Sequence, residues 1–272
     1  MSQSLESPAV RAHREVVERL WTRPLLNACA ELLPLVEGKT VLSAESRCGA
    51  VVTHWLKYLP EETRMMALDS NASMLDCARE RVSEAEQRRI FFVQQRVNAL
   101  SYADEVFEAS VCLHGLVSRR QLDEGLAELA RVTSSGGLVM AALPTSESFD
   151  AFYDLLDEAL RSHGLHEALE RLGELKERTL VDAGAAARSA RNFGLHDLIL
   201  ERIRWDLSFA SGRDFLQSPL IQETFFPHWS GAIRGSEREA VLGYITRAID
   251  TYWRDRTFDT PIEAAVVIGR RL

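Results

Sequence analysis

Short apolar runs alternate with stretches of helical period between residues 39 and 144. The apolar runs predict five strands, near residues 39–44, 64–68, 90–94, 108–113 and 137–143. The segments between them place apolar residues at helical spacing, as in QLDEGLAELARV. Strands that alternate with helices in this way indicate a parallel sheet of the α/β class.

The two ends of the chain follow other patterns. Apolar positions at helical spacing from Pro8 to Val36, interrupted by Pro24, predict two short helices that cap the sheet. A long helical region is predicted from Ser146 to about Asn192. Two further strands are predicted near residues 198–209 and 262–269, separated by a mixed insertion and a helix. No repeat or low-complexity linker divides the chain, so we expect one domain over residues 1–272.

Composition narrows the possible partners. The chain has 272 residues, of which 46% are hydrophobic, and its formal net charge is −8. Acidic and basic residues are interleaved, as in EALERLGELKER, so no basic stripe indicates binding to nucleic acid. No leader segment and no apolar run of about 20 residues is present, so we expect a bacterial-type soluble protein of the cytoplasm with no membrane partner.

The four cysteines contain no CxxC pair and no His/Cys cluster at metal-binding spacing. They are typical of small buried apolar residues in a reducing compartment. We therefore expect no metal site.

The segment Val41 to Val52 reads VLSAESRCGAVV and predicts a strand, a short polar loop and the start of a helix. The first such turn of a doubly wound domain usually carries several glycines, because its backbone approaches a ligand closely and adopts positive φ. Only Gly49 is present here. Glu45 and Arg47 stand at the spacing where two further glycines are expected.

The order of KTVLSAESRCGAVV, MMALDSNASMLDCARERV, FFVQQRVNALSYADEVFEASVC and LAELARVTSSGGLVMAALP resembles the class I S-adenosylmethionine-dependent methyltransferases over about Trp21 to Pro144. The resemblance implies a Rossmann-like, seven-stranded, mainly parallel sheet with helices on both faces. It divides the chain into an N-terminal helical cap, a cofactor-site half, a helical lid over the cleft, and C-terminal strands and helices, at residues 1–36, 37–144, 145–195 and 196–272.

The resemblance also implies the positions that would bind the cofactor, which are Ser43, Glu45, Arg47, Gly49, Asp69, Ser70, Arg96, Val97 and His114. Several of them depart from the family. Ser43 replaces an acidic residue, and Glu45 and Arg47 replace loop glycines. Arg96 stands where the family has an aspartate that accepts a bond from the adenine amino group, yet a guanidinium can only donate. Asp69, which matches the residue that holds the ribose hydroxyls, is intact.

Asp69 and His114 each have a second interpretation. Asp69 is equally well explained as the N-cap of the following helix, where Ser70 or Asn71 would also serve. His114 lies where the family places substrate and is a candidate general base. A lone histidine after an apolar run is more often simply packed, and Val117 and Ser118 replace a His-His pair often found after this strand. We therefore predict no catalytic residue.

Three explanations fit the charged residues in the loop. The first is neutral drift of the sequence on a surface that binds no ligand. The second is that Arg96 forms an ion pair with Glu45 or Asp69 that plugs the site. The third is that Arg47 and Arg96 hold an anionic ligand. Drift or a plug favours a non-catalytic pseudo-methyltransferase with a binding, scaffolding or regulatory role and no cofactor, or S-adenosylmethionine bound weakly. Its partner would be a protein or a small-molecule ligand. The alternative is an active methyltransferase that acts on a small molecule.

Overall fold

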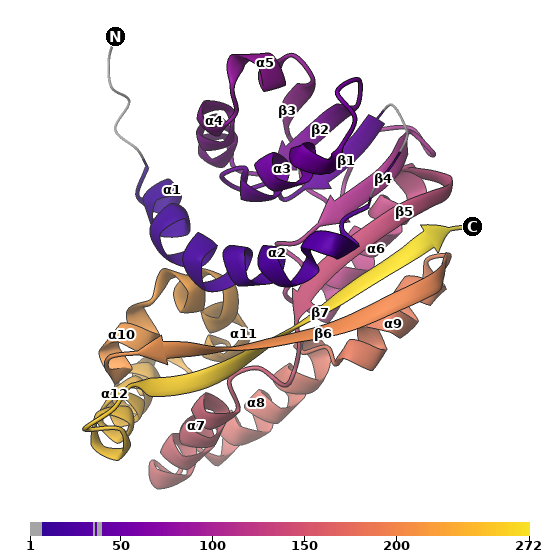
Figure 1. The fold of residues 1–272 in the computed structure, drawn as a ribbon. Coiled ribbons are helices and arrows are strands. Elements are labelled where there is room, and N and C mark those ends of the chain that lie inside the picture. Colours follow the sequence, from indigo (N-terminus) through magenta and orange to yellow (C-terminus); the bar gives the residue numbers. More distant parts are fainter. Residues whose placement is uncertain (1–6, 35, 37–39) are drawn as a thin grey trace. The chain divides into compact units, whose positions relative to one another are not determined.

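A seven-stranded sheet with the order β3-β2-β1-β4-β5-β7-β6 is the central element of the fold (Figure 1). The computed structural model describes residues 7–34, 36 and 40–272. The strands are β1 (Thr40–Ala44), β2 (Arg64–Asp69), β3 (Ile90–Gln94), β4 (Phe107–Cys112), β5 (Thr133–Pro144), β6 (Leu195–Phe209) and β7 (Phe258–Arg271). The pairings of β1 with β2 and β4, of β2 with β3, and of β4 with β5 are parallel. In Figure 1 the arrows of β6 and β7 run in opposite directions.

The predicted fold class and all seven predicted strands are confirmed, with boundaries that differ by a few residues. Lys39, the first residue of the first predicted strand, lies outside the described residues. Nearly every residue of β1 and β4 is buried. Strands covered on both faces need apolar residues on both faces, so these two appear in the sequence as continuous apolar runs.

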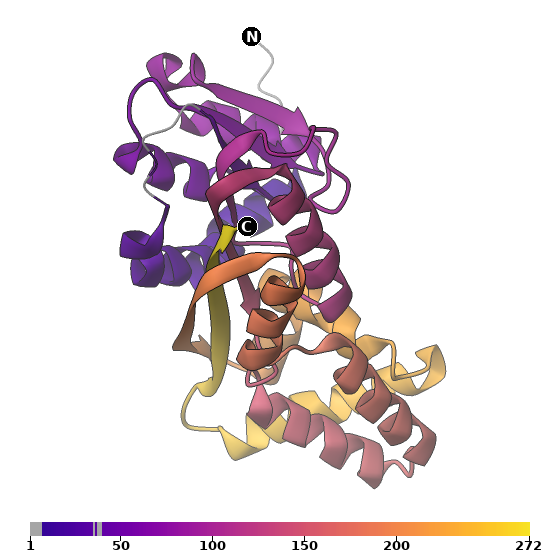
Figure 2. The same ribbon diagram turned by 90° about the vertical axis from the view of Figure 1, so that its right-hand side faces the viewer.

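Helices cover both faces of this sheet. Figure 1 shows α2 and α3 on one face and α6 and α9 on the other, and Figure 2 agrees. The helices are α1 (Pro8–Ala12), η1 (His13–Thr22), α2 (Arg23–Cys29), η2 (Ala30–Leu32), α3 (Ala50–Trp55), η3 (Leu56–Tyr58), α4 (Ala72–Arg81), α5 (Glu84–Gln87), α6 (Arg119–Val132), α7 (Asp150–Ser162), α8 (His166–Thr179), α9 (Ala183–Asn192), α10 (Gly212–Gln217), η4 (Ile221–Phe225), α11 (Phe226–Ser230) and α12 (Gly235–Tyr252). Within the described ranges, no helix is both long enough and apolar enough to cross a membrane.

Helix α6 shows how the sequence sets the ends and the buried face of a helix. The Ser118 side chain accepts a hydrogen bond from the Gln121 backbone N–H and caps the first turn. Leu122, Leu126 and Leu129 recur at helical spacing and are buried. Burying each leucine contributes about 1.5–3 kcal/mol, which is enough to fix this face of the helix against its neighbours.

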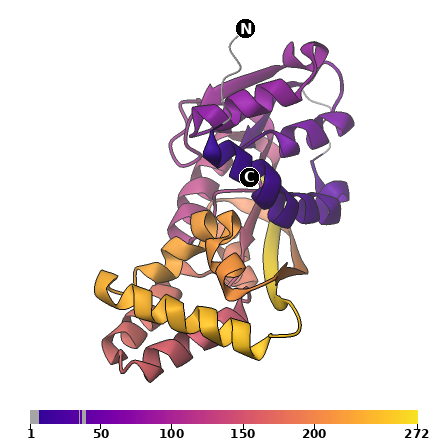
Figure 3. The same ribbon diagram turned by 90° about the vertical axis from the view of Figure 1, so that its left-hand side faces the viewer.

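The N-terminal helical segment does not break at Pro24 as expected. It runs from Pro8 to Leu32, and residues His13–Thr22 form a π-helix (Figure 3). The Arg23 N–H bonds to the Glu18 carbonyl, five residues earlier, and Pro24 then occupies the first turn of α2. A proline is tolerated in a first turn because it has no N–H to satisfy there. The change of helical register therefore accommodates the proline.

The chain forms two compact units. Unit 1 comprises residues 1–143, 183–203 and 264–272, and unit 2 comprises residues 144–182 and 204–263. Helices α7 and α8 of the expected lid belong to unit 2, whereas α9 belongs to unit 1. The single domain with its lid over the cleft stays a prediction, because each unit is described by itself.

Unit 2 has its own aromatic core. Phe215 is fully buried, and its ring lies 5.1–5.3 Å from those of Phe152, Phe209 and Phe258. The rings of Phe152 and Trp229 are 4.1 Å apart. Helices α7 and α8 form a hairpin beside this core (Figure 2). Buried aromatic side chains of this size dominate the energetics of a small core.

Two glycines of unit 2 give a test of its packing. A Cβ on Gly212 would lie 2.7 Å from the Thr246 backbone, whereas a Cβ on Gly173, exposed in α8, would meet open space. We expect Gly212→Ala to lower the free energy of unfolding by about 1–3 kcal/mol through overpacking. Gly173→Ala should raise it by up to about 1 kcal/mol through helix propensity. Urea unfolding measures both changes, and equal midpoints for the two variants would contradict the packing described here.

Candidate cofactor site

The loop between β1 and α3 keeps the backbone conformation that glycines usually supply. Glu45, Arg47 and Gly49 have φ of 49°, 50° and 80°. A left-handed conformation costs about 1–2 kcal/mol for a residue with a side chain. The loop also approaches α4 closely, since a Cβ on Gly49 would lie 2.9 Å from that of Ala78. The sequence change at positions 45 and 47 has therefore left the course of the loop intact.

Asp69, at the carboxyl end of β2, anchors this loop. Its side chain is fully buried, and its Oδ2 accepts a hydrogen bond of 2.9 Å from the Arg47 backbone N–H. Its Oδ1 accepts one of 2.9 Å from the N–H of Asn71. Asn71, rather than Asp69, is the N-cap of α4, and it accepts from the N–H of Ser73. Asp69 therefore holds the loop and leaves the helix cap to Asn71.

The side chains of Glu45 and Arg47 form an ion pair above Asp69. The Arg47 guanidinium lies 3.4 Å from the Glu45 carboxylate and 3.8 Å from that of Asp69. Glu45 is buried, and the backbone N–H of Val97 near it favours its charged form. Its side chain also packs against Gly115, where a Cβ would lie 2.9 Å from Glu45 Cγ.

Burial raises the pKa of Glu45 above its ordinary value. The positive charge of Arg47 opposes this shift, and the negative charge of Asp69 adds to it. Burial thus disfavours the charged form of Glu45, and the nearby Arg47 guanidinium and Val97 N–H partly offset that effect.

Two buried histidines lie beside the loop. His114 follows β4, and its Nε2 is 3.2 Å from the Thr22 hydroxyl of the π-helix. The ring of His13 meets that of His114 edge-on, with centroids 5.7 Å apart. Burial, then Arg47, lowers the pKa of His13 to about 4, and burial with the nearby His13 lowers the pKa of His114 well below its ordinary value. Both rings are neutral at neutral pH and are chemically able to accept a proton.

Arg96 contradicts the expectation of an ion-pair plug centred on that residue. Its side chain is exposed, and no described acidic group lies within 4.0 Å of it. It acts on Glu45 only as the weakest of several charges. Arg96 belongs to the turn after β3, which directs it outward, so Arg47 forms the ion pair that was expected of Arg96.

The other predicted residues divide between the site and its surroundings. Ser43 is buried, and its hydroxyl accepts a hydrogen bond of 3.0 Å from that of Ser46. Ser70 is exposed, and its carbonyl accepts a bond from the Gln94 side chain. The structure thus gathers seven of the predicted positions near the loop, namely Ser43, Glu45, Arg47, Gly49, Asp69, Val97 and His114. His13, Thr22 and Gly115 also lie there, and no sequence motif marks them.

Residues 45–137 match a family model described as a methyltransferase domain. A demethylmenaquinone methyltransferase from Bacteroides fragilis is 29% identical over 135 residues, which are 49% of this chain and 53% of that protein. A solved structure of a Bacillus halodurans protein, named as a candidate methyltransferase, superposes with a TM-score of 0.56 at 14% identity over 90% of this chain and 98% of that one.

The chain carries a segment, residues 45–137, that matches a methyltransferase domain, and it has the fold of the class I S-adenosylmethionine-dependent methyltransferases. It spans about half the length of the first curated relatives that it matches. The solved [4+2]-cyclase SpnF has the same fold, with a TM-score of 0.52 at 15% identity over 91% of this chain and 81% of that one. These likenesses therefore show the fold, while the reaction has to be argued from the site.

The resemblance to the methyltransferases matches Glu45 and Arg47 to loop glycines of that family. It matches Asp69 to the residue that holds ribose, and both assignments stay predictions. Each of its carboxylate oxygens accepts one backbone N–H and has a further lone pair for a ligand hydroxyl. Arg47, whose side chain is 28% exposed, covers Asp69. A ligand would reach Asp69 only after the Arg47 side chain turns away.

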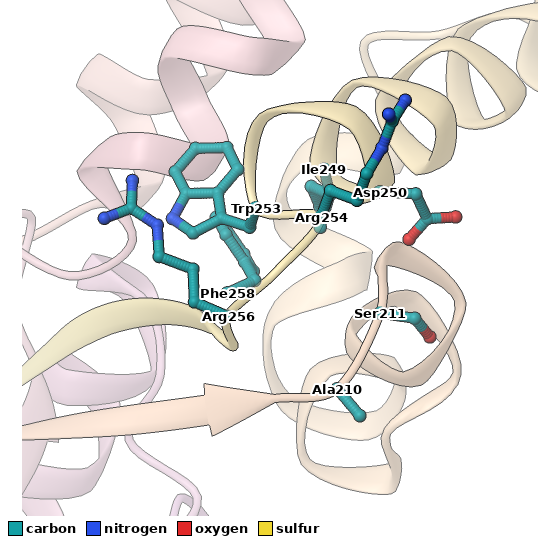
Figure 4. Close-up of a pocket in the computed structure, with 8 residues that line it drawn as sticks. All are labelled: Ala210, Ser211, Ile249, Asp250, Trp253, Arg254, Arg256 and Phe258. Atoms are coloured by element: carbon teal, nitrogen blue, oxygen red, sulfur yellow. The ribbon is translucent and has the colours of Figure 1, made fainter.

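Unit 2 carries a separate pocket of about 230 Å³ (Figure 4). Trp253 and Phe258 meet edge-to-face in it, with ring centroids 4.9 Å apart, and Arg256 flanks Trp253. Figure 4 shows Arg254 directed away from Trp253. Asp250 is engaged with the Gly212 N–H at 2.8 Å. The polar side chains of this pocket do not point toward one common position, so they form no acid–base pair or ligand-binding site.

The titration of Glu45 gives a test of the site. Because the folded state raises the pKa of this carboxyl, it binds the proton more tightly than the unfolded chain does. The wild type should therefore gain stability relative to Glu45→Gln as pH falls from neutral to about 4.5, the region of the unfolded pKa. Urea unfolding at several pH values measures this difference. Glu61→Gln, at an exposed position, is the control, and a pH-independent difference for Glu45→Gln would contradict the description of the site.

Proposed function

We propose that this chain is an S-adenosylmethionine-dependent methyltransferase that acts on a small molecule, with a cofactor site that Glu45 and Arg47 occlude until they move. The observation that carries the proposal is the loop itself. All three glycine-type positions keep positive φ above a buried, intact Asp69. S-adenosylmethionine, when bound, supplies an electrophilic methyl group on a sulfonium centre.

The strained backbone of Glu45 and Arg47 argues for this proposal and against neutral drift at a site that binds no ligand. Glu45 and Arg47 hold a backbone conformation that is unfavourable for residues with side chains. Such strain persists only where the surrounding structure imposes it, and it gathers at ligand sites and switches. A loop with no remaining role has no reason to keep it.

The occlusion is weak enough for a ligand to displace. A partly exposed ion pair such as Glu45–Arg47 is worth about 0–1 kcal/mol. Losing the acceptor at Arg96 costs about 1–3 kcal/mol more. Subtracting about 1–4 kcal/mol from the roughly 8 kcal/mol of micromolar binding leaves a dissociation constant between about 5 µM and 1 mM. The cofactor would therefore bind weakly but saturably.

A second candidate function rests on the contacts of Glu45. Glu45 is buried, and its side chain fills the space against Gly115. A side chain packed in this way favours a non-catalytic protein with a binding or scaffolding role, whose partner would be a protein or a small ligand. The cyclase of the same fold supports a role other than methyl transfer.

Calorimetric titration with S-adenosylhomocysteine tests the proposal. The wild type should bind with a dissociation constant between about 5 µM and 1 mM, and Glu45→Gly/Arg47→Gly should bind at least tenfold more tightly, since both occlusion and strain are removed. Glu105→Gly is the matched control. Glu105 also has positive φ, at 61°, but lies outside the site. It should leave the dissociation constant unchanged, and a wild type without saturable binding up to 1 mM would favour the non-catalytic candidate.

A further inference from the structure

Three sulfur atoms gather where the cofactor loop meets α4. The Cys48 thiol lies 3.5 Å from the thioether sulfur of Met74, and Cys77 packs against this cluster. Met74 and Cys77 are three residues apart on α4, so they share one face of that helix. Cys48 directly follows Arg47 in the loop. Cys48 and Cys77 are free cysteines.

The surroundings of this sulfur cluster are dry and apolar. Cys48 and Met74 are buried, and Val10 and Ala9 of α1 pack around them. Cys77 is half-buried and gives access from the surface. Within the described residues, no group of three or more His, Cys, Asp or Glu is arranged to hold a metal ion. That set of four ligand types does not include methionine, so it does not cover a site in which a methionine thioether binds the metal.

We propose that Cys48, Cys77 and Met74 form a binding site for Cu(I). Two thiolates and one thioether are the soft ligands that Cu(I) prefers. Metal–sulfur bonds of about 2.3 Å place three trigonal ligand sulfurs about 4 Å apart, close to the 3.5 Å between Cys48 and Met74. Zn(II) takes four ligands from thiolate, imidazole and carboxylate, and this cluster offers only two of them.

Cu(I) binds cysteine as the thiolate, so binding must release the protons of the two thiols. The apparent affinity should therefore rise with pH near neutrality.

Competition with bicinchoninate tests the proposal on the full, reduced chain under anaerobic conditions. The wild type should withdraw one equivalent of Cu(I) from the coloured bicinchoninate complex, more strongly at pH 8 than at pH 6. Cys48→Ser and Cys77→Ser should each weaken the affinity by more than about 100-fold, since losing a ligand exceeds the 10–100-fold effect of an outer-shell change. Met74→Leu removes a neutral thioether and not a charged thiolate, so it should weaken the affinity less than either serine variant does.

Cys29→Ser is the matched control, because Cys29 is equally buried but lies away from the cluster. It should bind Cu(I) as the wild type does. Thermal melting separates loss of the site from loss of the fold, and the half-buried Cys77 is the safer variant if Cys48→Ser unfolds. The proposal is overturned if the wild type withdraws no Cu(I), if Cys77→Ser binds like the wild type while folded, or if a tenfold excess of Zn(II) displaces the Cu(I).

Discussion

The two backbone hydrogen bonds to Asp69 are the constraint on which the site depends. One oxygen accepts the N–H of Arg47 in the loop, and the other accepts the N–H of Asn71 before α4. The carboxylate therefore ties the first loop of the sheet to the second strand and the helix that follows. An ionised carboxylate in a fully buried position needs such charge-assisted bonds, each worth about 1.5–3 kcal/mol.

This anchor explains why the loop tolerates unusual residues. Arg47 N–H is fixed on Asp69 and Gly49 is pressed against Ala78, so the backbone from residue 47 to residue 49 has little freedom. The Glu45 and Arg47 side chains then lie over the anchor and pair with each other. The same loop also carries Cys48, which contacts Met74 of α4.

The sequence predicted the sheet well because its signal is local. Apolar runs and the turns between them located every strand, and the order of motifs indicated the family. The site was predicted less well because it depends on side-chain direction. Arg96 was expected inside, but the turn after β3 points it outward. His13 belongs to no sequence motif. It contacts His114 because it lies in a π-helix, which no residue pattern predicted.

The chemistry of the cluster also could not be predicted from spacing alone. Cys48 and Cys77 are far apart in sequence, and the contact between them arises from the packing of the loop on α4. Likewise, the sequence placed charged residues at the glycine positions but could not show that the backbone beneath them is unchanged. That unchanged backbone is what favours a working cofactor loop over a degraded one.

The most direct test of this central claim is the amide resonance of Val97 in a titration followed by ¹⁵N–¹H NMR. Val97 is buried beside Glu45, so a cofactor that enters the site must change the surroundings of its N–H. Adding S-adenosylhomocysteine should shift the Val97 and Arg47 amides saturably below about 1 mM, while Gly173 in unit 2 stays unchanged. Val97 and Arg47 resonances that stay in place throughout the titration would contradict the account.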